Sequence, residues 1–124
     1  MVKYLISLVC CLYSGILSAQ PKMQFDSTSY DYGIIESGFV LVKEFRFTNI
    51  GNAPLIISHV QTDGGCMAEW PKDPISHGSH GVIKITYNRQ GVGKFERTAT
   101  VSCNDPKQPY ILRIKGKVMR HKTQ

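Results

Sequence analysis

The sequence predicts an all-β fold, an antiparallel β-sandwich of about seven strands preceded by a cleaved signal peptide. Several segments alternate apolar and polar residues with a period of two, which is the pattern of strands with one buried face. Turn-forming residues separate these segments at short intervals, and no window has a helical period. The chain has 124 residues, the length of a single domain, which excludes large multidomain enzymes and polytopic membrane proteins.

Residues 1–19 are predicted to be a signal peptide rather than part of the fold. Lys3 supplies a positive charge, residues 4–17 are largely apolar, and Ala19 provides a small residue before the cleavage point. The apolar run is shorter than the roughly 20 residues that a bilayer crossing needs. We therefore expect no membrane span, and a mature chain that is exported to the periplasm, to the envelope or out of the cell.

Residues 20–118 are predicted to form the domain, and residues 119–124 a basic tail. Within the domain, Phe45 and Phe47 share one face of the clearest strand. The expected strands span residues 23–26, 30–35, 40–49, 55–62, 82–88, 94–103 and 110–118. Short strands with regular turns over about 100 residues are typical of an immunoglobulin-like sandwich.

The longest irregular stretch, residues 63–79, is where we expect the function to lie, because long surface loops carry binding residues. If successive strands run antiparallel, this loop and the turn at 104–109 share one end of the sandwich. Cys66 and Cys103 then lie at that same end, and a pair of cysteines in an exported protein can form a disulfide. The alternative is a buried thiol at Cys103 and an exposed thiol at Cys66.

A set of short segments covers nearly the whole mature chain. They are Tyr30-Asp31-Tyr32-Gly33-Ile34-Ile35 with Gly38, Phe45-Arg46-Phe47-Thr48-Asn49 with Gly51, Pro54 and Leu55, Trp70-Pro71-Lys72-Asp73-Pro74-Ile75 with Gly78, Phe95 before 98–104, and Ile114-Lys115-Gly116-Lys117-Val118. In this order they resemble a family of exported bacterial immunoglobulin-like domains of unknown function, related to Hydin-type and major-sperm-protein-like sandwiches. The resemblance implies a fold and an exported location, and no known activity.

Many members of that family carry Cys-Gly-Cys-Thr where this chain has Gly64-Gly65-Cys66-Met67. A redox or metal role that depends on a cysteine pair in this loop therefore does not carry over to this chain.

Met67, Trp70 and Ile75 are the candidate contacts to a partner protein, because all three lie in the 63–79 loop and Trp is favoured at interface hot spots. Trp70 can instead close the core beneath the loop. We favour core closure, since Trp70 lies between Met67 and the segment Pro71–Ile75, which contains two prolines and an isoleucine.

An alternative function is that of a small thiol- or metal-handling envelope protein, which uses Cys66 with His77, His80 or Cys103. A thiolate nucleophile needs a nearby proton acceptor, and thiol and imidazole groups are ligands for borderline metals. The spacing lacks the tight pairs of a structural zinc site, so we favour solvated turn histidines. No cofactor is expected.

The formal net charge is +6, and its excess lies in the leader and the last twelve residues. The basic residues Arg113, Lys115 and Lys117 are interpreted as a solvated edge strand, and no nucleic-acid-binding face is expected. The chain contains no phosphate loop, nucleophile elbow, zinc-protease signature or calcium loop. We therefore expect a non-catalytic binding or assembly module, which contacts another envelope or secreted protein through a sheet edge or the 63–79 loop.

Overall fold

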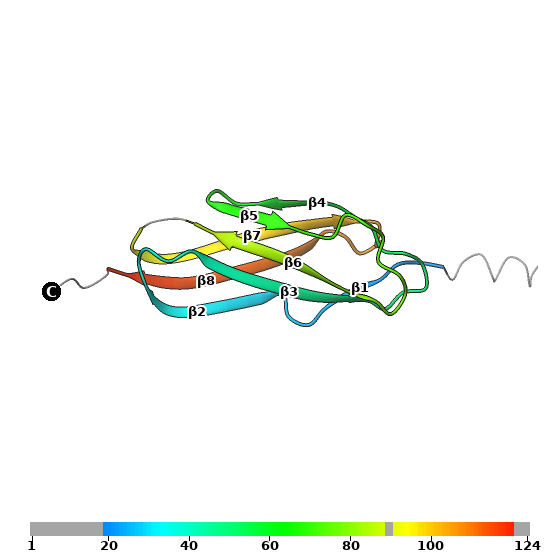
Figure 1. The fold of residues 1–124 in the computed structure, drawn as a ribbon, viewed down its shortest axis with the longest axis horizontal. Coiled ribbons are helices and arrows are strands. Elements are labelled where there is room, and N and C mark those ends of the chain that lie inside the picture. Colours follow the sequence, from blue (N-terminus) through cyan, green and yellow to red (C-terminus); the bar gives the residue numbers. More distant parts are fainter. Residues whose placement is uncertain (1–18, 89–90, 121–124) are drawn as a thin grey trace, which may run out of the picture.

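The computed structural model describes residues 19–88 and 91–120, and its ordered elements are all β-strands (Figure 1). The strands are β1 Met23–Phe25, β2 Ser29–Glu36, β3 Leu41–Asn49, β4 Ile57–Thr62, β5 Cys66–Glu69, β6 His80–Tyr87, β7 Gly93–Cys103 and β8 Tyr110–Met119. Residues 1–18 of the predicted signal peptide and residues 121–124 of the predicted tail lie outside the described residues, so both remain predictions.

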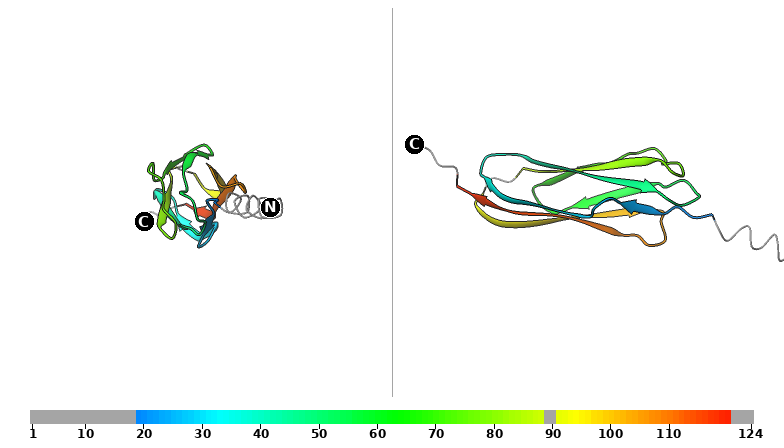
Figure 2. Two further views of the ribbon diagram at one scale, coloured as in Figure 1. Left: turned by 90° about the vertical axis from the view of Figure 1, so that its right-hand side faces the viewer. Right: turned by 90° about the horizontal axis from the view of Figure 1, so that it is seen from below.

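The strands form two four-stranded sheets that run along the long axis of the molecule (Figures 1 and 2). The first sheet has the order β1-β3-β6-β5, and the second has the order β2-β8-β7-β4. The pairs are antiparallel except that β2 runs parallel to β8. The sequence therefore predicts the β-sandwich correctly, with one parallel pair that the expected antiparallel pattern does not include.

The core lies between the sheets, and the predicted alternation identifies its residues. Inward-facing side chains of β3, β6, β7 and β8 are buried, as are those of the shorter β4. They include Phe45, Phe47, Ile83, Ile85, Tyr87, Ala99, Val101, Cys103, Leu112, Ile114, Ile57 and Val60. Removing these side chains from water provides the main favourable contribution to folding.

The predicted loop at 63–79 is not irregular throughout, because residues 66–69 form β5 at the edge of the first sheet. Cys66 pairs with Tyr87 and Glu69 pairs with Lys84. This added strand carries the chain back along the long axis of the sandwich. Residues 63–65 therefore lie at one end of the sandwich and residues 70–79 run toward the other. The expectation that residues 63–79 form one loop at one end is wrong.

The sandwich has a proximal end and a distal end. The proximal end holds the start of β1, the 49–56 segment and the β7–β8 turn. The distal end holds the β2–β3 turn, residues 63–65, the end of β6, the start of β7 and the end of β8 (Figure 1).

Two buried polar side chains hold the proximal end together. Asn49 accepts hydrogen bonds from the N–H groups of Lys22 (3.2 Å) and Gly51 (3.0 Å), and donates to the carbonyls of Ala53 (2.8 Å) and Ile75 (2.9 Å). All four bonds are to backbone groups of segments that lack a regular ladder. The side chain therefore replaces the strand pairing that these turns cannot make.

Asp105, in the β7–β8 turn, is only 2% exposed. Its carboxylate accepts hydrogen bonds from the Met23 N–H at 2.9 Å, the Lys107 N–H at 2.9 Å and the Tyr110 hydroxyl. Burial alone would raise the pKa of Asp105, but these hydrogen bonds to the charged form outweigh burial and lower the pKa. The carboxylate thus ties β1 to the start of β8.

Candidate functional site

The three predicted partner contacts have different environments. Met67 points outward from β5 and is 70% exposed, so it is available to a partner. Ile75 is 6% exposed, and its backbone bonds to Leu55 in both directions. Ile75 is therefore a core residue, and the prediction that it contacts a partner is wrong because its bridge to Leu55 holds it between the sheets.

Trp70 is half-buried and packs against the core where the chain leaves β5. Its ring meets the His59 ring of β4 edge-on at 5.6 Å, and the Lys72 ammonium lies 3.2 Å from its centroid. Because β4 and β5 are the edge strands of different sheets, the indole covers the open side of the sandwich between them. This position agrees with the favoured interpretation of core closure, although the ring covers a side of the sandwich rather than its end.

Cys66 and Cys103 are both free thiols in the structure. Cys66 borders a small apolar space beside Ala99 of β7, and Cys103 lies four residues further along the same strand. At the usual rise of a strand, Cys103 is about 13 Å from Ala99, the neighbour of Cys66. This separation is beyond the reach of a disulfide between the two cysteines. The expectation that the two cysteines share one end, on which the predicted disulfide depended, is therefore wrong.

His77 and His80, the proposed helpers of Cys66, also lie far from it. His80 begins β6, whereas Cys66 pairs with Tyr87 at the opposite end of that strand, about 23 Å away. His80 Nδ1 bonds to the Thr48 hydroxyl at 2.8 Å, and His77 bonds to the carbonyl of a proximal turn. Burial also raises the pKa of the Cys66 thiol, which disfavours the reactive thiolate.

The described residues offer no metal site in place of that arrangement. Within residues 19–88 and 91–120, no group of three His, Cys, Asp or Glu side chains is placed to hold an ion. The thiol- or metal-handling alternative has no support in this geometry.

Exposed apolar side chains gather at the distal end. Among the described residues, seven of the twelve large apolar side chains that are exposed lie there; they are Ile34, Phe39, Val40, Val42, Met67, Val92 and Met119. Val42 and Met67 are in register with Thr86 between them, so they share one row across the outer face of the first sheet. Single exposed apolar residues are ordinary, but a group at one end marks a candidate binding surface. We call these seven residues the distal apolar surface.

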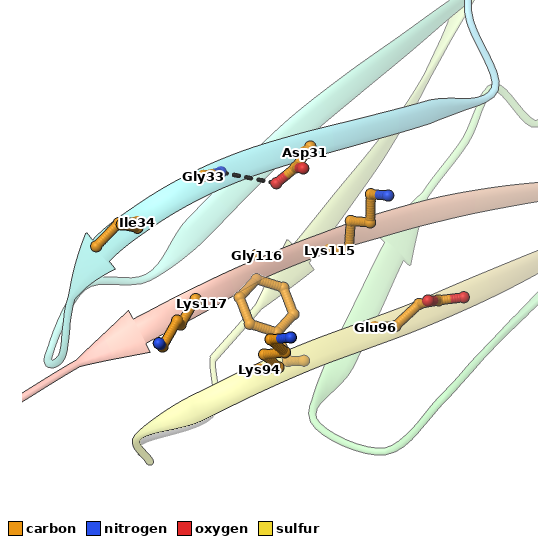
Figure 3. Close-up of a pocket in the computed structure, with 9 residues that line it drawn as sticks. Asp31, Gly33, Ile34, Lys94, Glu96, Lys115, Gly116 and Lys117 are labelled. Atoms are coloured by element: carbon orange, nitrogen blue, oxygen red, sulfur yellow. Dashed lines mark hydrogen bonds between the residues drawn. The ribbon is translucent and has the colours of Figure 1, made fainter.

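A groove of about 550 Å³ lies next to this surface, on the outer face of the second sheet (Figure 3). Residues of β2, β8 and β7 line it; they are Asp31, Gly33, Ile34, Lys94, Phe95, Glu96, Lys115, Gly116 and Lys117. β2 contains a bulge between Asp31 and Ile34, where the Gly33 N–H donates to the Asp31 carboxylate at 2.8 Å. We call this feature the lysine groove.

The charges of the lysine groove fall into two rows. In the first row Asp31, Lys115 and Glu96 are in register, so Lys115 lies between two carboxylates. In the second row Lys117 is opposite Lys94 (Figure 3). Like charges directly opposite each other disfavour strand pairing, so the second row keeps its positive charge at a cost to stability.

The sequence contains one signal for this groove. Arg113, Lys115 and Lys117 alternate along one strand and therefore share a face. The interpretation of these residues as a solvated edge strand is wrong, because β8 is a central strand of its sheet, between β2 and β7. The neighbours Asp31 and Lys94, distant in the sequence, cannot be identified without the register of all three strands.

No helix in the described part of the chain is long and apolar enough to cross a membrane. No curated protein sequence matches the chain.

Solved structures with a similar fold were found. A protein of unknown function from Porphyromonas gingivalis W83 is 21% identical with a TM-score of 0.71, over 81% of this chain and 48% of that protein. This chain therefore spans about half the length of that protein. The ASH / PapD-like domain 7 of human CEP192 is 12% identical with a TM-score of 0.67, over 83% of this chain and 89% of that domain.

The VesB protease of Vibrio cholerae also contains a similar sandwich, at 12% identity and a TM-score of 0.65, over 85% of this chain and 34% of the protease. At these identities the likeness shows the fold alone, and no activity follows from it.

The sequence itself matches a family model. The model, described as a protein of unknown function (DUF1573), covers residues 23–118, which run from the start of β1 almost to the end of β8. The relation to Hydin-type sandwiches and the departure from the Cys-Gly-Cys-Thr motif remain predictions. The chain belongs to the DUF1573 family of unknown function.

Proposed function

We propose that the chain is an exported, non-catalytic binding module, which captures another envelope or secreted protein at its distal end. The observation that carries this proposal is the distal apolar surface, where seven exposed apolar side chains surround the turns of one end. Burying such a surface against a partner is favourable because it removes apolar area from water. Met67, which belongs to the predicted 63–79 contact segment, is part of this surface.

The alternative route, strand addition at a sheet edge, is less favoured because three of the four edges are obstructed. β1 has only three residues, and the Met23 N–H already donates a hydrogen bond to the Asp105 carboxylate. The bulge in β2 breaks its edge, and bulges of this kind protect edges from pairing. On β5 the Cys66 N–H donates to the Asp63 carbonyl, and the Cys66 carbonyl accepts from the Thr62 hydroxyl.

The fourth edge, β4, spans Ile57–Thr62 and has the Trp70 ring against its His59. A docked strand would have to share that side with the indole. Contact through the distal end needs no such rearrangement, since Phe39 is 63% exposed and lies outside the ladders.

Site-specific crosslinking in the native cell envelope tests the proposal. A photoreactive amino acid at Phe39 or Met67 should give one discrete covalent adduct. The same amino acid at Ile50 or Ile56, exposed residues of the proximal end, should give none. Phe39→Asp should remove the adduct formed at Met67 without lowering the melting temperature, because Phe39 is not packed in the core.

Two results would contradict the proposal. Equal adducts at both ends would indicate nonspecific proximity rather than a docking surface. An intact mass from the envelope fraction that retains residues 1–19 would contradict the proposed export.

A further inference from the structure

The lysine groove has two neighbouring lysines that form no ion pair with the described carboxylates. Within residues 19–88 and 91–120 the one ion pair joins Arg113 to Glu96, at 3.0 Å. No carboxylate in this part of the chain lies within ion-pair distance of Lys94 or Lys117. Because these two lysines are opposite each other on β7 and β8, their ammonium groups can converge on a single anion between them.

The groove also adjoins the distal apolar surface. Ile34 is 75% exposed, lines the groove and belongs to that surface. It is in register with Lys117, so apolar and cationic side chains follow one another across β2, β8 and β7 (Figure 3). A ligand seated on Lys94 and Lys117 therefore extends directly onto the surface where the partner is proposed to dock.

We propose that the lysine groove binds the acidic side chains of an extended segment of the partner protein, an inference that rests on the proposed function. One carboxylate of the segment accepts hydrogen bonds from the ammonium groups of Lys94 and Lys117. An apolar side chain beside it packs on Ile34. The bound carboxylate offsets the repulsion within the lysine pair, which gives the interaction its preference for acidic partners.

The shape and charge of the groove favour a peptide over a lipid surface. The groove is concave, and a flat bilayer cannot fill a concavity of about 550 Å³. In the next row Asp31 and Glu96 flank Lys115, so the unpaired positive charge is confined to Lys94 and Lys117 and does not form the continuous basic face that attracts a sheet of anionic headgroups. Spaced carboxylates on an extended chain can instead meet Lys94 and Lys117 while avoiding Asp31 and Glu96.

The test uses the mature chain, residues 20–124, and a fluorescent twelve-residue peptide of alternating Glu and Val. A peptide of alternating Gln and Val is the uncharged control, and vesicles containing phosphatidylglycerol are the lipid control. Anisotropy should show that the Glu peptide binds about tenfold more tightly than the Gln peptide, with a loss of affinity at high salt. The amide signals of Gly33 and Gly116, but not of Gly51, should shift on binding.

Lys94→Glu and Lys117→Glu should each weaken binding of the Glu peptide by about tenfold or more. Neither variant should unfold the protein, because each places opposite charges across the β7–β8 pair. Lys22→Glu changes the net charge equally at the proximal end and should alter the affinity less than about twofold. An equal loss with Lys22→Glu, equal binding of the two peptides, or binding to vesicles alone would overturn the proposal.

The same variants separate this inference from the proposed function. If Lys94→Glu leaves the crosslinked adducts at Phe39 and Met67 unchanged and the Glu peptide does not bind, the partner docks without using the groove and the inference fails. If the peptide binds but Phe39 and Met67 give no adduct, the groove is selective and the proposed docking surface fails.

Discussion

Replacing Asp105 with alanine removes the acceptor that ties β1 to the start of β8. The carboxylate accepts three hydrogen bonds, from Met23, Lys107 and Tyr110. A hydrogen bond to a charged group contributes about 1.5–3 kcal/mol, and the lower value applies when water enters the space that the removed carboxylate leaves. Asp105→Ala should therefore lower the free energy of unfolding by about 4.5 kcal/mol, a large part of the stability of a domain of this size.

Urea unfolding of residues 20–124 at pH 7, followed by Trp70 fluorescence, measures this loss. Tyr110→Phe removes one of the three bonds and should cost only about 1.5 kcal/mol. A loss below about 1.5 kcal/mol for Asp105→Ala would show that the three hydrogen bonds do not stabilise the proximal end.

The pH dependence tests the charge of Asp105 separately. Its pKa is lowered in the folded state, against about 3.9 for an unfolded aspartate. Its contribution to stability is therefore complete above about pH 4 and is lost as the pH falls through the lower folded value. The wild-type protein should lose stability more steeply below pH 4 than Asp105→Ala does, and parallel curves would contradict a charged role.

Two further predictions follow from the environments of Trp70 and the thiols. Trp70→Ala should lower the free energy of unfolding by about 2–3 kcal/mol, since a half-buried indole packs on the core, and Trp70→Phe should restore most of the loss. Urea unfolding followed by circular dichroism measures this, because both variants lack the one tryptophan of the chain. A loss below about 0.5 kcal/mol would mean that the ring does not close the sandwich. Burial raises the pKa of Cys66 and of Cys103, so iodoacetamide at pH 7 should modify both thiols only slowly in the folded protein and fully in urea. Intact mass without reductant measures this, and a mass two hydrogens light would contradict the separation of the cysteines.

The strands that carry a strong alternation could be predicted from the sequence. The pattern at 40–49 places Phe45 and Phe47 on the same face, and both are buried in the structure. The same holds for Ile83 and Ile85 of β6. In these segments the residues prefer strands and their period matches a half-buried sheet, so local and global preferences agree.

β5 could not be predicted in this way, because Cys66-Met67-Ala68-Glu69 is short and contains no β-branched or aromatic residue. Its strand conformation depends on pairing with β6, which the sequence pattern of four residues does not reveal. Because β5 reverses the direction of the chain, the ends of the sandwich and the position of Cys66 also differ from those that the sequence predicts. The lysine groove cannot be predicted for a related reason, since its residues meet only once three strands are in register.

The parallel pairing of β2 with β8 determines the order in which the molecule can fold. β2 is among the first strands in the chain and β8 is the last, yet β8 lies beside β2 inside its sheet. The second sheet therefore cannot be completed until the residues of β8 are available, and the contact that completes it spans most of the domain. Such long-range closure is slow, and the unpaired strands are exposed until it occurs. In a chain that is still being synthesised, β2 thus lacks its partner strand until Tyr110–Met119 has emerged.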